Sequence, residues 1–164
     1  MTTINVAATT PINHPLSSPT LTHAQVWAGL ARKIHHPCEF VPVITGCTLL
    51  REDEHGGGVV TFTRRVTFQG GRQVIETCTM YPPNRVRFVA DDDGSEVQNV
   101  ISLGLHGELY MTHAFSWKRE GVVPGGEAFR EEEAMNQNMA IAAVSKSVEA
   151  MRQMVSDGRI EHCI

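Results

Sequence analysis

Residues 127–157 decide the fold, and they read E-A-F-R-E-E-E-A-M-N-Q-N-M-A-I-A-A-V-S-K-S-V-E-A-M-R-Q-M-V-S-D. Neither Pro nor Gly interrupts this stretch and good helix formers dominate it, which predicts one helix about 45 Å long. Its apolar residues form a stripe wide enough to be buried. The stripe comprises Met135, Met139, Ile141, Ala142, Ala143, Val144, Val148, Ala150, Met151, Met154 and Val155. Since one long helix needs a matching apolar surface, we expect it to lie in a curved sheet, with room for a small molecule beside its flexible Met and small Ala and Ser residues.

The chain before this helix begins with one strand and two short helical segments. Residues 3–13 alternate weakly between apolar and polar side chains and predict the strand. Thr22 and Gln25 have the spacing of a capping box at a helix start, and Pro37 ends that helix. One further short turn of helix is expected over residues 38–42.

The middle of the chain has the pattern of an antiparallel meander. Alternating segments are separated by turn residues such as Gly70-Gly71, which fit a two-residue hairpin loop. The predicted strands cover residues 43–51, 59–68, 72–81, 85–90, 96–103 and 108–119. With the first strand they predict an α+β fold, in which a curved seven-stranded antiparallel sheet wraps around the long C-terminal helix. A chain of 164 residues is expected to form one domain, residues 1–164.

The composition excludes several classes of function. Net charge is −4 at pH 7 and the basic residues are spread along the chain, so we expect no nucleic-acid partner. No stretch approaches the apolar length of a membrane span, so no membrane association is expected. The first ten residues lack the pattern of a signal peptide, and the four cysteines show no C-x-x-C spacing. Both features favour a cytoplasmic protein with reduced thiols.

Four of the mainly apolar strand faces each carry one polar residue. Strand period two places Arg64, Glu76, Asn99 and His113 on the faces that we expect to point inward. In one interpretation, Arg64 and Glu76 form an ion pair across a hairpin while Asn99 and His113 are satisfied polar groups of the core. In the other, all four are the directional groups of a small-molecule site in apolar walls. Both interpretations stay open at this point.

The site interpretation assigns a role to each residue. His113 would move a proton, while Arg64, Glu76 and Asn99 would steer or stabilise charge that develops on a substrate oxygen. The other residues expected to contact a ligand lie on the inward strand faces or on the long helix. They are Phe62, Cys78, Met80, Met111, Phe115, Met135, Met139, Ala143, Ser147 and Met151.

Two alternative sites have weaker support. Cys78 and His113 could form a nucleophile pair, but buried Cys is more often an apolar filler and no local motif surrounds this one. The run His-His-Pro-Cys at residues 35–38 contains metal-binding atoms, but adjacent histidines at a helix end do not converge on one ion. His and Cys at residues 162–163 would join them only by an accident of folding. We therefore expect neither a metal nor a cofactor.

Five segments carry a resemblance to a known family. They are L-T-H-A-Q-V-W-A-G-L (21–30), E-F-V-P-V-I (39–44), V-Q-N-V-I-S (97–102), L-Y-M-T (109–112) and M-V-S-D-G-R-I (154–160). With the order of elements, they resemble the START/SRPBCC superfamily, whose helix-grip fold is that of the birch pollen allergen. They are most similar to its mostly fungal branch of the acetylaranotin biosynthesis cluster protein L type. The resemblance spans nearly the whole chain.

The resemblance implies a hydrophobic cavity between sheet and long helix, and frequent association with secondary-metabolite pathways. Superfamily members bind lipids, sterols, hormones and polyketides, and some act as cyclases, dehydratases or condensing enzymes without cofactors. We therefore expect a cofactor-independent cyclase, isomerase or dehydratase that acts on a hydrophobic biosynthetic intermediate. The alternative is a carrier that shields such a molecule without chemistry. The sequence leaves the formation of a homodimer open.

Overall fold

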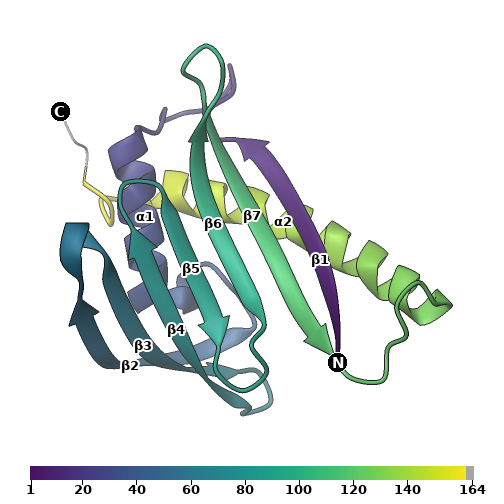
Figure 1. Ribbon diagram of the computed structural model, residues 1–164. Coiled ribbons are helices and arrows are strands. Elements are labelled where there is room, and N and C mark those ends of the chain that lie inside the picture. The colour runs from purple at the N-terminus through teal and green to yellow at the C-terminus, as the bar shows by residue number, and fades with distance from the viewer. Residues whose placement is uncertain (162–164) are drawn as a thin grey trace.

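Seven antiparallel strands form one sheet in the order β1-β7-β6-β5-β4-β3-β2 (Figure 1). The computed structural model describes residues 1–161, so the His and Cys at residues 162–163 lie outside the described part of the chain. The strands are β1 (Thr2–Pro11), β2 (Ile44–Glu54), β3 (Val60–Phe68), β4 (Gln73–Tyr81), β5 (Arg85–Ala90), β6 (Glu96–Leu103) and β7 (Leu109–Arg119). The predicted meander from β2 to β7 is confirmed, and β1 pairs with β7 to complete the sheet.

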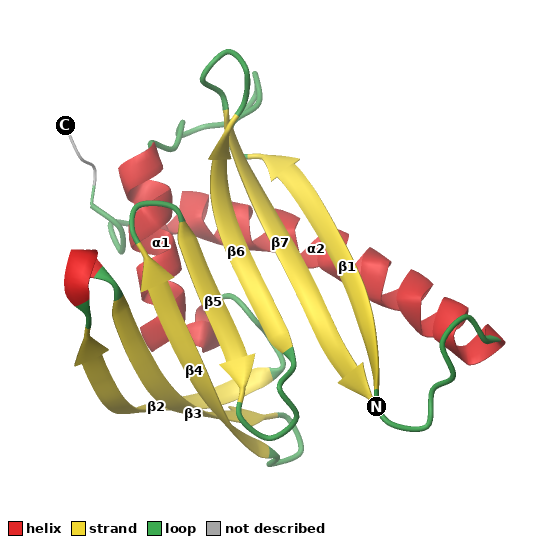
Figure 2. Ribbon diagram, in the orientation of Figure 1, coloured by secondary structure: helices red, strands yellow, loops and turns green. Residues whose placement is uncertain are grey.

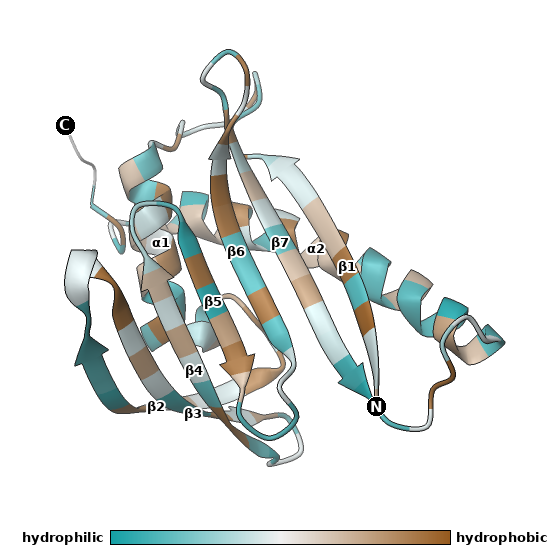
Figure 3. Ribbon diagram, viewed as in Figure 1, coloured by the Kyte–Doolittle hydropathy of each residue, from teal (hydrophilic) through white to brown (hydrophobic). Residues whose placement is uncertain are grey.

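Tight turns and strand register fix which side chains face inward. Gly70 and Gly71 both have φ of 87°, a backbone conformation that favours glycine, and they join β3 to β4. This turn sets the pairing of Arg64 opposite Glu76, and the β6–β7 hairpin sets Asn99 opposite His113. Hydrophilic and hydrophobic bands alternate along most of the strands (Figure 3), as expected for a sheet with one buried face.

The helices α1 (His23–His35) and α2 (Glu127–Ser156) lie on one face of the sheet, which curves around them, whereas the single turn η2 (Gly56–Gly58) lies at the end of the β2–β3 hairpin (Figure 2). A second single turn, η1 (Pro37–Glu39), follows α1. The predicted capping box at the start of α1 is present: the Gln25 backbone N–H donates to Thr22 Oγ1 at 3.2 Å, and the Thr22 N–H donates to Gln25 Oε1 at 2.9 Å. None of the helices in residues 1–161 is both long and apolar enough to cross a membrane.

The long helix α2 packs on β1, β7 and α1 rather than on the whole sheet. Its buried stripe follows the spacing i, i+4 through Asn136, Ala140 and Val144, and continues toward the end of the helix. Met135 was expected on this stripe but is 61% exposed, and the expected burial of Ile141 is likewise wrong at 54% exposed. The helix is rotated relative to our expectation, since the polar Asn136 and the small Ala140 are the residues buried in this part of the helix.

The core occupies the side of the sheet where α1 crosses α2. At that crossing Gly29 allows Met151 to approach the α1 backbone, since a Cβ on Gly29 would lie 2.6 Å from Met151 Cγ. We call this region the packed side. It is defined by the apolar residues Ile4, Val26, Leu30, Val144, Val148, Met151 and Met154, all at most 2% exposed.

Candidate functional site

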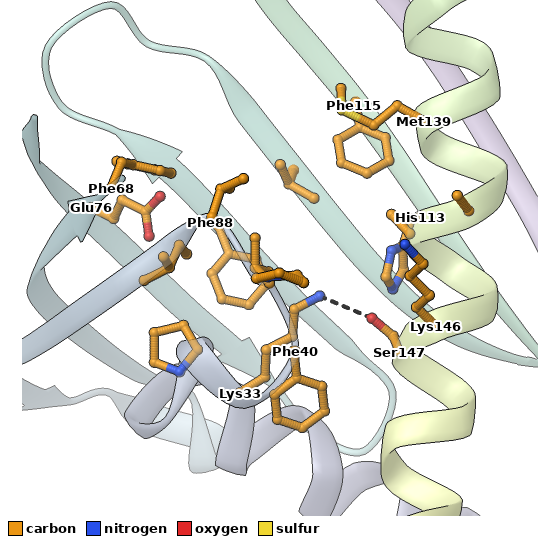
Figure 4. A pocket seen from close by; sticks show the side chains of 18 of the residues that line it. Lys33, Phe40, Phe68, Glu76, Phe88, His113, Phe115, Met139, Lys146 and Ser147 are labelled. Atoms are coloured by element: carbon orange, nitrogen blue, oxygen red, sulfur yellow. Dashed lines mark hydrogen bonds between the residues drawn. The ribbon is translucent and has the colours of Figure 1, made fainter. Parts of the chain in front are cut away.

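A cavity of about 440 Å³ lies between the concave face of the sheet, the end of α1 with η1, and the middle of α2 (Figure 4). Most of its wall is apolar. The larger apolar wall residues are Phe40, Ile44, Phe68, Phe88, Phe115, Trp117 and Met139, and the polar ones are Lys33, Arg64, Glu76, His113, Lys146 and Ser147. We call this region the cavity side. A second hollow of about 250 Å³ shares Phe68, Glu76, Phe88, Val97 and Trp117 with it.

Lys33 reaches into this cavity from the last turn of α1. Its Nζ donates to Asn99 Oδ1 at 2.9 Å and to Ser147 Oγ at 3.4 Å, and it lies 5.8 Å from the centre of the Phe88 ring. Within residues 1–161 no carboxylate forms a salt bridge with it. Burial, and secondarily the charge of Arg64, lower the pKa of Lys33 to about 7. This amine can therefore be either charged or neutral at neutral pH.

His113 and Asn99 lie opposite each other on β7 and β6, and both are buried. His113 Nε2 and Asn99 Nδ2 have no hydrogen-bond partner among the described residues. Burial and the nearby charge of Lys33 lower the pKa of His113 well below its ordinary value, so the imidazole is neutral at neutral pH. Two polar atoms are thus buried and unsatisfied beside a lysine amine. Such orphans are uncommon in cores.

Arg64 and Glu76 form the predicted ion pair across the β3–β4 hairpin. The Arg64 Nε and Nη2 groups donate to Glu76 Oε2 at 2.9 and 2.7 Å. Nη1 donates to the backbone carbonyls of Lys33 and Ile34, at 2.9 and 2.7 Å. These carbonyls belong to the end of α1, where helix carbonyls lack helical partners. Arg64 therefore holds the turn that presents Lys33, and little of its donor capacity is left for a ligand.

Seven of the residues predicted for the site are on the cavity wall. They are Arg64, Glu76, His113, Phe115, Met139, Ala143 and Ser147. Asn99 lies behind the wall, as the acceptor for Lys33. The inward face predicted for each of these strand residues is confirmed by the register and by burial. Their role in binding or chemistry stays a prediction.

The other predicted contact residues lie away from the cavity wall. Phe62, Cys78, Met111 and Met151 are buried in the core, Met80 is half-buried against it, and Met135 is exposed on α2. These placements correct our expectation, because an inward strand face serves both the packed side and the cavity side and period two does not distinguish them. Burial also raises the pKa of the Cys78 thiol to about 12, which disfavours the nucleophilic thiolate.

Sequence reasoning missed Lys33, the most unusual side chain of the site. The signal was present: Val26, Leu30 and Lys33 follow the spacing i, i+4, i+7 that marks the buried face of α1. We followed this face through Ile34, the adjacent apolar position, and did not consider the lysine. A lysine at a core position of an amphipathic helix requires an explanation, because a charged amine is rarely buried without a partner.

The chemistry available at the site is proton transfer and interaction with a substrate oxygen. Lys33 can donate or accept a proton, and the neutral His113 offers a ring nitrogen. Glu76 accepts from Arg64 through Oε2 only, so its Oε1 remains available as an acceptor. Across residues 1–161 no group of three or more His, Cys, Asp or Glu side chains is placed to hold a metal ion.

Comparison with known sequences identifies related proteins over nearly the full chain. The family model described as "AtaL: Acetylaranotin biosynthesis cluster protein L" matches residues 6–158. A curated protein of that description from Aspergillus terreus (strain NIH 2624 / FGSC A1156) is 27% identical over 161 residues. The match covers 97% of this chain and 94% of that protein.

Comparison with solved structures identifies the fold. The di-domain ARO/CYC StfQ from the steffimycin biosynthetic pathway matches with a TM-score of 0.59 and 10% identity, covering 96% of this chain and 52% of that one. This chain therefore spans about half of the di-domain protein. The Zhui aromatase/cyclase from Streptomyces sp. R1128 matches with a TM-score of 0.52 and 18% identity, covering 96% and 99% of the two chains. At these identities the likeness shows the fold alone, and the predicted helix-grip architecture is confirmed.

Proposed function

Because this chain belongs to the acetylaranotin biosynthesis cluster protein L family, we propose that it is an enzyme of secondary metabolism that cyclises, isomerises or dehydrates a hydrophobic intermediate. The related solved structures bear the descriptions aromatase/cyclase and ARO/CYC, which supports a reaction of the cyclase type. The chain's own residues would supply the acid and the base, without a cofactor.

The observation that carries this proposal is the pair formed by Lys33 and His113 in one apolar cavity. A carrier needs only apolar walls and a few satisfied polar groups to orient its ligand. This cavity instead buries an amine without an ion-pair partner beside an imidazole whose Nε2 is unpaired among the described residues. Perturbed titratable groups in a cleft are typical of catalytic sites.

In the proposed mechanism the cavity first holds the intermediate in a folded conformation, which lowers the entropic part of the barrier. The Lys33 ammonium donates to a substrate oxygen, replacing its contact with Ser147 Oγ, and stabilises the negative charge that develops there. The neutral His113 takes a proton from the adjacent carbon through Nε2 and returns it to a carbon or to a departing oxygen. Arg64 positions Lys33 by holding the end of α1.

The alternative is a carrier that shields the same kind of molecule. It is supported by the mainly apolar wall and by Glu76 Oε1, which accepts no side-chain hydrogen bond from the described residues and could orient a ligand at the cavity edge without chemistry. In a carrier the two unsatisfied polar atoms would be met by groups of the ligand. The two functions predict different behaviour for variants that keep the cavity but remove proton transfer.

The test is deletion of the gene in the organism that encodes this chain, with metabolites profiled by liquid chromatography and mass spectrometry. The deletion should accumulate an intermediate that the wild-type gene converts to product. Lys33→Met and His113→Leu, which keep volume and apolar walls, should not restore conversion. The matched controls Lys118→Met and His106→Leu, both away from the cavity, should restore it in full. If Lys33→Met and His113→Leu restore product to the wild-type level, the protein is a carrier and the enzyme proposal is wrong.

A further inference from the structure

The substrate class of this cavity follows from the surroundings of the Lys33 amine. We infer that Lys33 is a covalent residue, which captures an aldehyde or ketone carbonyl of the substrate as an imine. This inference rests on the proposed function and deepens it, since it replaces a hydrogen bond from Lys33 with a bond and restricts the substrate to carbonyl compounds.

The first support is the kind of partners that the amine has. Asn99 Oδ1 and Ser147 Oγ are both neutral, and they come from β6 and α2, so Nζ is held between two elements without a countercharge. A carboxylate at either position would stabilise the ammonium form, which is no nucleophile. Neutral acceptors in an apolar wall leave the free amine accessible at neutral pH, and that is the state that attacks carbonyls.

The second support is the charge arrangement around the amine. The Arg64 guanidinium of β3 disfavours a positive charge on the Lys33 amine and so lowers its pKa. Glu76 of β4, the partner of Arg64, raises that pKa by a smaller amount. From β7 the buried His113 is neutral. The residue that α2 contributes to the cavity wall next to Ser147 is Lys146, which is not a carboxylate. None of these neighbours within the described chain contributes an anion that touches Nζ.

The step balances with groups that are already present. The lone pair of the neutral Nζ forms a bond to the carbonyl carbon, the C=O π electrons move to oxygen, and a proton passes from nitrogen to that oxygen to give a carbinolamine. The C–O bond then breaks and the oxygen leaves as water with the second amine proton, so that one carbonyl compound and one amine give one imine and one water. Nothing is oxidised or reduced.

Two residues beside the amine each carry an unsatisfied polar atom. His113 Nε2 and Asn99 Nδ2 are buried and unpaired among residues 1–161, and Asn99 Oδ1 already binds the amine. Asn99 lies behind the wall and positions the amine through Oδ1, while His113, which lines the cavity, can relay the proton that the carbinolamine oxygen needs to leave as water. In the imine, a proton on the adjacent carbon is acidified. This is the bond activation that a cyclisation or dehydration of a carbonyl compound needs.

The experiment uses the full chain, 2-naphthaldehyde as the probe and sodium cyanoborohydride to reduce any imine to a stable amine. The chain has only three lysines, Lys33, Lys118 and Lys146, so peptide mass spectrometry assigns each adduct and separates the terminal amine. Lys146 is the internal comparison, since it lines the same cavity but is exposed. At pH 7 an ordinary lysine is neutral in only roughly one molecule in 3,000, whereas a pKa of about 7 leaves a large fraction of the Lys33 amines neutral.

We expect Lys33 to carry at least about tenfold more adduct than either other lysine at neutral pH. The rate at Lys33 should rise from about pH 6 to pH 8 with a midpoint near 7. Lys33→Met should abolish this adduct while Lys118→Met leaves it unchanged, with circular dichroism confirming that both variants are folded. Equal labelling of the three lysines, or no adduct at Lys33 in the wild-type chain, would overturn the inference.

The outcome is independent of the test of the proposed function. If Lys33 is not labelled but Lys33→Met still fails to restore conversion in the deletion strain, the enzyme proposal stands and Lys33 acts only through hydrogen bonds. If Lys33 is labelled but Lys33→Met restores conversion, the amine is reactive and the catalytic proposal fails.

Discussion

The packed side and the cavity side occupy the same concave face of one sheet, and they treat burial in opposite ways. On the packed side, Val144, Val148 and Met151 fill the space between α2 and α1 with apolar side chains. On the cavity side, Lys33 and His113 are almost as deeply buried, yet neither has a charged partner. Burial therefore stabilises the fold on the packed side, whereas on the cavity side it shifts the pKa values of two titratable groups.

This difference shows which residues of the concave face stabilise the folded state and which do not. Apolar side chains gain roughly 25 cal/mol per Å² of surface removed from water, and each residue of the packed side contributes in this way. A buried amine or imidazole opposes folding instead. Natural proteins retain such destabilising groups mainly where function requires them. The comparison thus predicts that the packed side provides stability and that the cavity side carries the proposed function, and three substitutions test this prediction.

The largest effect is expected for Met151→Ala on the packed side. Met151 is fully buried against Gly29, so its removal loses apolar contacts and leaves a cavity at the crossing of the helices. We expect the free energy of unfolding to fall by about 4 kcal/mol, measured by urea denaturation. Met135→Ala, on the exposed part of the same helix, is the matched control and should change it by less than about 0.5 kcal/mol. Equal losses in the two variants would show that α2 has no packed side of the kind described.

The next effect is expected for Glu76→Gln, at the edge of the cavity. It removes the countercharge of Arg64, which is 4% exposed at its side chain and also holds the end of α1. A buried charge left without its partner destabilises by about 3 kcal/mol.

The control for Glu76→Gln is Asp53→Asn, which breaks the pair with Arg51, a residue whose side chain is 71% exposed. A surface pair contributes about 0–1 kcal/mol, so this variant should unfold near the wild-type urea concentration. If Glu76→Gln is as stable as Asp53→Asn, the Arg64–Glu76 pair does not hold the cavity side together.

The sequence predicted the architecture because its strongest signals are local. Thr22 and Gln25 set the start of α1, and Gly70-Gly71 sets a hairpin, which in turn brings Arg64 opposite Glu76. Each of these depends on spacings of a few residues, which the chain displays directly. The strand faces, the meander and the long helix all follow from signals of this kind.

The sequence did not separate the packed side from the cavity side, because that division depends on how α2 lies across the sheet. Cys78 and Glu76 are two residues apart on one strand face, yet Cys78 is in the core and Glu76 is on the cavity wall. The rotation of α2 was equally hidden, since Ala140 faces the sheet while the more apolar Met139 is 48% exposed. Apolar and small residues on both faces of a helix leave its orientation to tertiary packing.

The smallest effect, and the one with an opposite sign, is expected for Lys33→Met. Burial of the wild-type lysine opposes folding, while the variant leaves Asn99 without its hydrogen-bond partner, which costs about 1–3 kcal/mol. The lowered pKa means that burying the charged lysine costs roughly 5 kcal/mol. Removing this cost outweighs the lost hydrogen bond, so we expect the free energy of unfolding to rise by about 2 kcal/mol at pH 7.

The pH dependence identifies the cause of that gain. The unfolded chain keeps a proton on Lys33 up to the ordinary pKa of 10.5, whereas the folded chain loses it near 7, so between these values the unfolded state binds more protons. Wild-type stability should therefore rise from pH 7 to pH 10.5 relative to Lys33→Met, and the advantage of the variant should shrink across that window. The unfolded chain loses the His113 proton near pH 6.5, so above about pH 7.5 His113 is largely neutral in both states and contributes little. If the variant is less stable than wild type at every pH, Lys33 stabilises the fold as the residues of the packed side do. The boundary between the packed side and the cavity side would then have to be redrawn so that Lys33 belongs to the packed side.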